Sequence, residues 1–86
     1  MTAHTPGPWH SVGLTIRDRD ARTIARMEYR YPEVANDARL IAAAPELLAM
    51  VMDLTAHLDA HPGRTRDDEA LLDEARAAIA KARGGA

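Results

Sequence analysis

The hydrophobic positions of this chain first follow a period of two and then a helical period. Apolar residues alternate with polar or small ones over residues 12–17, and a second alternating run covers residues 23–29. Alternation of this kind predicts two half-buried strands. The polar run 18–21 between them predicts a turn, although it lacks the glycine that often relieves such turns. A β-hairpin is therefore expected, and residues 9–11 could supply a short third strand.

From residue 33 the apolar positions take up helical spacing, and Pro45 divides this region into two helices. Proline cannot continue a straight helix but is well tolerated as the first residue of a new one. After Pro45, apolar residues recur at intervals of four, three and four, which predicts an apolar seam. The seam consists of Leu47, Val51, Leu54 and Leu58. It is widened by Leu48, Met50 and Met52. The resulting arc of roughly 200° exceeds the ~100° needed for one neighbour, so contacts on two sides are expected.

The last helix is predicted to fold back on the preceding one. Residues 61–65 contain a Pro-Gly pair that ends one helix, and Thr65 with Asp68 three residues later suggests an approximate capping box. The short loop predicts an antiparallel αα-hairpin. The expected fold is α+β: a short antiparallel β-hairpin, with a third strand as an option, followed by two to three helices. A single domain of residues 1–86 is predicted, with an irregular lead-in (1–8), a β section (9–30) and a helical section (33–83).

Composition narrows the possible functions. The chain has 86 residues, no cysteine and a formal net charge of -2. The absence of cysteine excludes disulfides and thiolate chemistry, and the charge makes direct nucleic-acid binding an unfavoured function. There is no glycine-rich phosphate loop and no recognisable nucleophile elbow, so we expect a protein that is not an enzyme and needs no cofactor. The sequence has no run of roughly 20 apolar residues, the length needed for a membrane span, so a cytoplasmic protein is expected.

Two stretches resemble a widespread family of small phage and prophage proteins. Residues 4–9 match the opening HTPGPW, and residues 35–48, ANDARLIAAAPELL, are similar to the family's ANARLIAAAPELLEAL helix. The resemblance covers about two thirds of the chain and implies no particular reaction. It implies a phage accessory protein that works in the cytoplasm of a bacterial host.

Protein binding is the leading functional hypothesis, with a host protein or complex as the partner. A defence complex such as a CRISPR effector is one such partner, which would make the chain anti-CRISPR-like. The wide apolar arc has two explanations. The β-hairpin covers one flank and the last helix the other, or part of the arc is exposed and forms a homo-oligomer, most simply a dimer, or binds a partner through adaptable methionines. The predicted partner-binding residues are acidic or apolar: Asp67, Asp68, Glu69, Asp73, Glu74, Leu48, Met50 and Met52.

The alternative hypothesis is a sponge-like protein that binds a small ligand such as a nucleotide. It would use hairpin arginines and aromatic side chains, namely Trp9, Arg17, Arg19 and Tyr29. An ordinary charged strand face and aromatic residues that plug a small core explain the same pattern. Asp53, His57 and His61 are spaced four apart on one helix, but a solvated helix face explains them better than a metal site, so no metal site is predicted.

Overall fold

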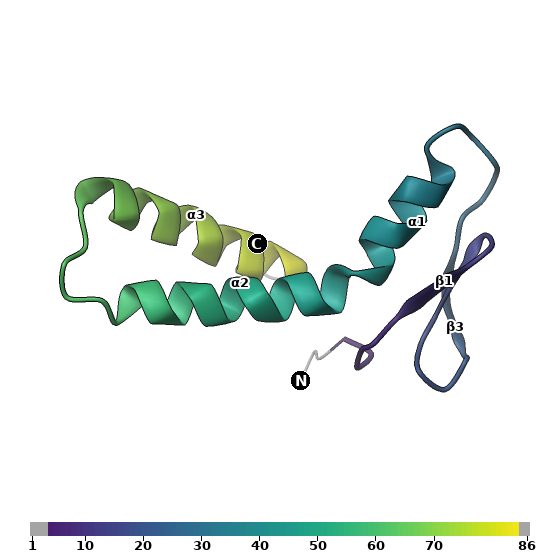
Figure 1. The fold of residues 1–86 in the computed structure, drawn as a ribbon, viewed down its shortest axis with the longest axis horizontal. Helices are drawn as coiled ribbons and strands as arrows, with labels where there is room; N and C mark the ends of the chain where they lie inside the picture. The colour runs from purple at the N-terminus through teal and green to yellow at the C-terminus, as the bar shows by residue number, and fades with distance from the viewer. Residues whose placement is uncertain (1–3, 85–86) are drawn as a thin grey trace. The chain divides into compact units, whose positions relative to one another are not determined.

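The computed structural model describes residues 4–84 as three short strands followed by three helices (Figure 1). The elements are β1 (His10–Val12), β2 (Thr15–Arg17), β3 (Thr23–Arg26), α1 (Val34–Ala42), α2 (Ala44–Asp59) and α3 (Arg66–Ala82). The chain divides into two compact units, here called the sheet unit (Thr5–Leu47) and the hairpin unit (from Leu48 onward). The predicted α+β class, with an αα-hairpin at its end, is confirmed.

The sheet is an antiparallel meander in the order β1-β2-β3. Val12 pairs with Thr15, so the chain reverses through the two-residue turn Gly13-Leu14. Gly13 has a φ of 60°, and a glycine with positive φ at the first central position fits a type II′ hairpin turn. The prediction of one strand over residues 12–17 is therefore wrong, because the turn interrupts it. The optional third strand is present as β1.

The second predicted strand is shorter in the structure than the alternation suggested. β3 ends at Arg26, although the N–H of Met27 still donates to the carbonyl of Leu14 at 2.6 Å. Residues 27–29 were predicted to continue the strand and do not. Tyr29 is 68% exposed, so burial of its side chain does not stabilise a longer strand. Alternation alone overestimated the length of this strand.

A buried carboxylate organises the turn between β2 and β3. Asp18 is 4% exposed, and its Oδ1 accepts the backbone N–H groups of Asp20 at 2.9 Å and Arg22 at 3.0 Å. Its Oδ2 accepts Nε of Arg22 at 3.0 Å. The turn predicted at residues 18–21 is therefore closed by a side chain instead of by glycine. Ala21 takes the left-handed conformation, with a φ of 65°.

Helix α1 packs on β1 and β2 through small side chains. Ala38 and Ala42 are buried, and Ile16 of the central strand is fully buried. Alanine leaves space for a close approach between helix and sheet, so one isoleucine can form the centre of this small core. At the start of α1, the hydroxyl of Tyr31 donates to Asp37 Oδ2 at 2.8 Å, which raises the pKa of Tyr31.

The helix break predicted at Pro45 occurs one or two residues earlier. α1 ends at Ala42, Ala43 forms the break, and α2 begins at Ala44. Pro45 thus lies in the first turn of α2, where its missing N–H has no helical partner to lose. A side chain at Gly7 would place a Cβ 3.0 Å from the Cβ of Pro45, so the lead-in packs closely on this turn.

In the hairpin unit, α2 and α3 run side by side in opposite directions (Figure 1). The predicted capping box is present: the Thr65 hydroxyl accepts the N–H of Asp68 at 3.2 Å, and the Asp68 carboxylate accepts the N–H of Thr65 at 2.9 Å. Leu72 is 1% exposed and points into the contact between the two helices. α3 ends before Gly84, whose φ of 83° suits a residue just past a helix end.

Candidate protein-binding surface

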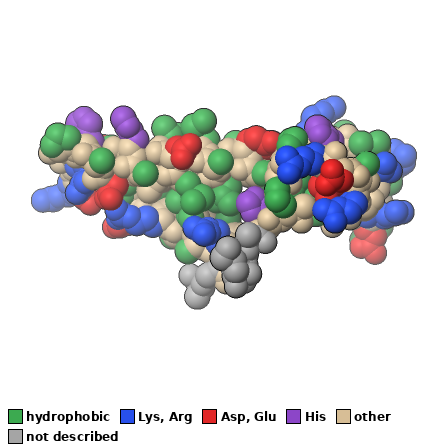
Figure 2. Space-filling view, turned by 90° about the horizontal axis from the view of Figure 1, so that it is seen from below, with side chains coloured by type: hydrophobic (Ala, Val, Ile, Leu, Met, Phe, Trp, Pro, Cys, Tyr) green, Lys and Arg blue, Asp and Glu red, His purple; other side chains and the backbone are tan. Residues whose placement is uncertain are grey.

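The apolar side chains of the hairpin unit remain largely exposed. No described residue of α2 is buried, and Met50, Leu54 and Leu71 are 55%, 59% and 57% exposed. Figure 2 shows hydrophobic side chains that reach the surface over the helical hairpin. The predicted residues Met50 and Met52 are exposed, whereas Leu48 is half-buried. Single exposed apolar residues are ordinary, but several on one helix pair indicate an interaction site.

Leu54 and Leu71 border a groove between α2 and α3. The groove has a volume of about 310 Å³ and is lined by Val51, Leu54, Thr55, Leu58, Leu71, Leu72 and Ala75. Its one polar side chain, Thr55, donates its hydroxyl to the carbonyl of Val51 at 2.6 Å. The groove therefore offers an apolar surface whose single hydroxyl is already satisfied, and it can bury an apolar side chain from a partner.

The acidic residues predicted to bind a partner fall into two groups. Asp68 is engaged in the capping box, Glu69 lies 2.6 Å from Arg64, and Asp73 lies 3.4 Å from Arg76. Over the described part of the chain, the carboxylates of Asp67 and Glu74 have no ion pair and no hydrogen bond. These two residues are exposed, so they carry the negative charge that α3 can offer to a partner.

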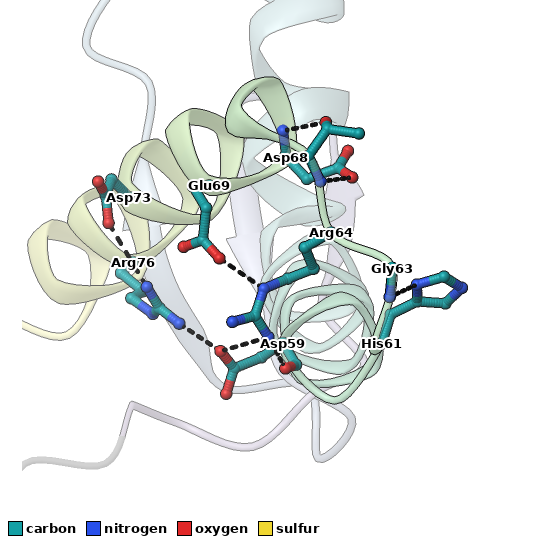
Figure 3. A network of polar contacts seen from close by, with 9 residues as sticks. Asp59, His61, Gly63, Arg64, Asp68, Glu69, Asp73 and Arg76 are labelled. Carbon is teal, nitrogen blue, oxygen red and sulfur yellow. Dashed lines mark hydrogen bonds and ion pairs between the residues drawn. The ribbon is translucent and has the colours of Figure 1, made fainter.

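The ion pairs of Glu69 and Asp73 belong to a polar network at the loop end of the hairpin (Figure 3). Arg76 Nη2 lies 2.6 Å from Asp59 Oδ1, and Arg64 lies 3.8 Å from the same oxygen while also donating to the Asp59 carbonyl. Glu69 raises the pKa of Arg64 through their hydrogen bond. Sequence reasoning missed this network. The charged residues beside the loop are visible in the sequence, but the antiparallel register that brings Arg76 to Asp59 is not.

The residues suspected of metal binding do not converge. Among the described residues no group of three His, Asp or Glu side chains is placed to hold a metal ion. His61 instead uses its Nδ1 to accept the N–H of Gly63 at 3.1 Å. His61 thus helps to close the Pro-Gly loop that ends α2.

The four residues of the ligand-binding alternative have different surroundings. Trp9 is half-buried and donates its indole N–H to the carbonyl of Thr5 at 3.1 Å, and Arg17 donates to the Thr15 hydroxyl at 3.3 Å. Arg19 is exposed in the β2–β3 turn, and Tyr29 is exposed beyond β3. A hollow of about 360 Å³ lies beside Trp9, and its other lining residues are His10, Ser11, Arg39, Ala42 and Ala43.

A second hollow in the sheet unit contains two arginines that sequence reasoning had not singled out together. It has a volume of about 310 Å³ and includes Arg30 and Arg39 in its lining, with Ser11 and Gly13 from the first turn region. Arg39 donates to Asn36 Oδ1 at 2.7 Å, whereas Arg30 has no ion pair within residues 4–84. No sequence signal linked these positions, because only the packing of α1 on β1 brings Arg39 beside Ser11.

Comparison with known proteins identifies the family. The family model of Salmonella phage P22 protein Y8K6 matches residues 1–86. The chain belongs to this phage protein family. Neither the curated proteins nor the solved structures include a match to this Y8K6 family member. Over residues 4–84, no single helix is long and apolar enough to cross a membrane, whereas the bent pair α1 and α2 together meets that criterion by length and composition.

Proposed function

We propose that this Y8K6 family member is a non-enzymatic phage accessory protein that acts in the bacterial cytoplasm by binding a host protein. The observation that carries the proposal is the exposed apolar surface of the hairpin unit, where α2 has no buried residue. Burial of such side chains against a partner is the main favourable contribution to protein association. Family membership supports the phage context.

The more specific form of the proposal is inhibition of a host defence complex, for example a CRISPR effector. A surface that binds nucleic acid is basic, and the unpaired carboxylates of Asp67 and Glu74 would be attracted to it. In this form of the proposal the apolar groove supplies most of the affinity, while the two carboxylates speed association and favour a basic partner.

A cleavage assay with purified CRISPR effectors tests this proposal. The protein is titrated into each effector, and inhibition of target cleavage is measured. Leu54→Asp should weaken inhibition at least tenfold, because it places a charge in the groove. Ala56→Asp is the matched control, since it introduces the same charge at an exposed site on the opposite side of α2. The double variant Asp67→Asn/Glu74→Gln should weaken inhibition mainly at low salt.

Two results would contradict the proposal. If no effector in a panel that covers the main CRISPR types is inhibited or bound, the defence-inhibitor form fails. If Leu54→Asp and Ala56→Asp inhibit as well as the wild type, the groove is not the binding surface.

A second candidate function is binding of a small anionic ligand in the sheet unit. The hollow lined by Arg30 and Arg39 favours it, because two guanidinium groups at one cavity suit phosphate. A thermal-shift screen against nucleotides tests this function, since a ligand at 100 times its Kd adds roughly 2.7 kcal/mol of stability. Arg39→Gln should abolish a shift, whereas Arg19→Gln, in the distant turn, should leave it unchanged. Absence of a shift with every nucleotide would refute this function.

A further inference from the structure

The hairpin unit buries too little of its own apolar surface to be complete. Leu72 is the only fully buried side chain described in α2 and α3, and the helices leave Met50, Leu54 and Leu71 more than half exposed. Helices in proteins obtain most of their stability from packing of an apolar face against other elements. The open face of the groove therefore requires a cover.

We infer that a second copy of this chain covers the groove, so that two αα-hairpins form a four-helix bundle around a two-fold axis. This inference rests on the proposed function in one respect, because it assigns an occupant to the same apolar surface. Asp67 and Glu74 lie four residues before and three residues after Leu71, so in the bundle their carboxylates would border the interface, present twice.

The spacing of apolar residues fits a bundle on both helices. Val51, Leu54 and Leu58 recur at three and four on α2, and α3 has small or apolar residues at four, three and four. The α3 positions are Leu71, Ala75, Ala78 and Ala82. Spacing of this kind produces the seams of antiparallel four-helix bundles. A hairpin with such a seam on each helix constitutes half of a bundle.

Side-chain size makes the face self-complementary. α2 exposes the large side chains Met50 and Leu54. The α3 seam has one large exposed side chain, Leu71, followed by small ones at Ala75 and Ala78. In a two-fold dimer every copy presents both types, so the large residues of one copy can pack on the small residues of the other. A foreign partner would not require this combination on one face.

The paired charges of α3 lie away from the seam. Glu69, Asp73 and Arg76 recur at four and three, so they share a different side of α3 from Leu71 and Ala75. Their charges are already paired in the network of Figure 3. A second copy could therefore cover the groove without disturbing this network. Asp67 and Glu74 flank Leu71 at the edge of the seam and must stay solvated there, because the burial of an unpaired charge opposes association.

The available area is sufficient for a modest dimer. Met50, Leu54 and Leu71 are each more than half exposed, and a dimer that covered them would have a small interface, near the lower limit of roughly 1,000 Å² for a specific contact. An interface of this size is expected to dissociate in the micromolar range, so the mass should depend on concentration.

Sedimentation equilibrium on the full chain tests the inference. The wild type should approach twice the 9.4 kDa chain mass as its concentration rises from about 1 to 200 μM. Leu54→Asp should weaken the dimer at least about 30-fold, the effect of a central interface residue. Ala56→Asp should remain dimeric, and circular dichroism checks that both variants retain their helices. A wild type that stays monomeric throughout this range would overturn the inference.

Cysteine cross-linking tests the same interface even if Leu54→Asp fails to fold. The natural chain has no cysteine, so a single introduced thiol reacts without background. Ala75→Cys should give a covalent dimer with a short bismaleimide, whereas Ala77→Cys, on another side of α3, should not. If the Ala75→Cys variant is a monomer whose introduced thiol is protected from maleimide, the same chain covers the groove, and this result would also refute the inference.

These outcomes separate the dimer from the proposed function. A monomeric wild type that still inhibits a defence effector would refute the second copy and leave host binding intact. A dimer with no host target would support the bundle and refute the proposed function.

Discussion

Replacement of Ile16 by alanine should destabilise the sheet unit strongly, because Ile16 is the large side chain at the centre of its core. It lies on the middle strand, is 0% exposed, and packs where α1 approaches through Ala38 and Ala42. The change removes three carbons, worth about 0.8 kcal/mol each in transfer from water. The alanines of α1 have no long side chains to fill the space, so a cavity of roughly 50 Å³ would add about 1 kcal/mol. The expected loss is about 3.5 kcal/mol.

A matched substitution at Ile41 distinguishes burial from a general effect of losing an isoleucine. Ile41 is 37% exposed, so Ile41→Ala should lose only part of the transfer free energy and leave no closed cavity. About 1 to 1.5 kcal/mol is expected. The two variants should therefore differ by roughly 2 kcal/mol, which is a substantial fraction of the about 5–15 kcal/mol stability of a typical domain.

The assay is urea denaturation followed by two probes. Trp9 is the only tryptophan and belongs to the same unit as Ile16, so its fluorescence reports on the sheet unit. Circular dichroism at 222 nm is dominated by the long helices α2 and α3. Ile16→Ala should lower the fluorescence midpoint more than the dichroism midpoint if the units unfold separately. A loss for Ile16→Ala that is no larger than the loss for Ile41→Ala would refute this account of the core.

Three further predictions concern turns, caps and pH. Ala21→Gly should raise the stability of the sheet unit by about 0.5–1 kcal/mol. Glycine has no Cβ to clash in the left-handed conformation, and this gain exceeds the extra backbone entropy that glycine loses on folding. A decrease in the urea midpoint would contradict this. Thr65→Ala should cost about 1 kcal/mol by removing the cap of α3, measured by thermal unfolding. Thr55→Ser is the comparison, because serine keeps the hydroxyl that donates to the Val51 carbonyl. The pKa of Asp18 lies below its usual value of 3.8, first because of the Arg22 backbone N–H, so its contribution to stability is present above that value and is lost as pH falls through the folded pKa. Asp18→Asn should flatten this part of an acid titration of stability, and an unchanged titration would disprove the role of the carboxylate.

Local signals in the sequence were sufficient for the order and type of the elements. Pro45 marked the helix break to within two residues, and Thr65 with Asp68 gave the N-terminus of α3. Each signal acts within one turn of the chain, so it needs no knowledge of the rest of the fold. The αα-hairpin followed because a short loop leaves two helices few other arrangements.

The errors arose where packing outweighs pattern. The alternation of Val12, Leu14 and Ile16 suited one strand equally well, but positive φ at Gly13 allows a two-residue turn that places Leu14 in the loop. The burial of Asp18 was not foreseen, because a charged residue in a turn is usually solvated.

The candidate surface was predicted only in part. The wide apolar arc on α2 agrees with the exposure of Met50 and Met52, because the width of an arc is a property of one helix. The split among the acidic residues could not be predicted, because it depends on which arginine reaches which carboxylate across the loop. The hollow with Arg30 and Arg39 likewise depends on tertiary packing.

The ion pairs around Asp59 connect α2 and α3 at only one end of the helical hairpin. Its ion pairs gather at the loop, whereas Lys81 and Arg83, near the other end, form no ion pair in the described part of the chain. Fraying should therefore begin at the carboxyl-terminal end of α3 and progress toward the loop. A protease that cuts after basic residues would shorten the chain from Arg83 and Lys81 well before it cleaved at Arg64 or Arg76.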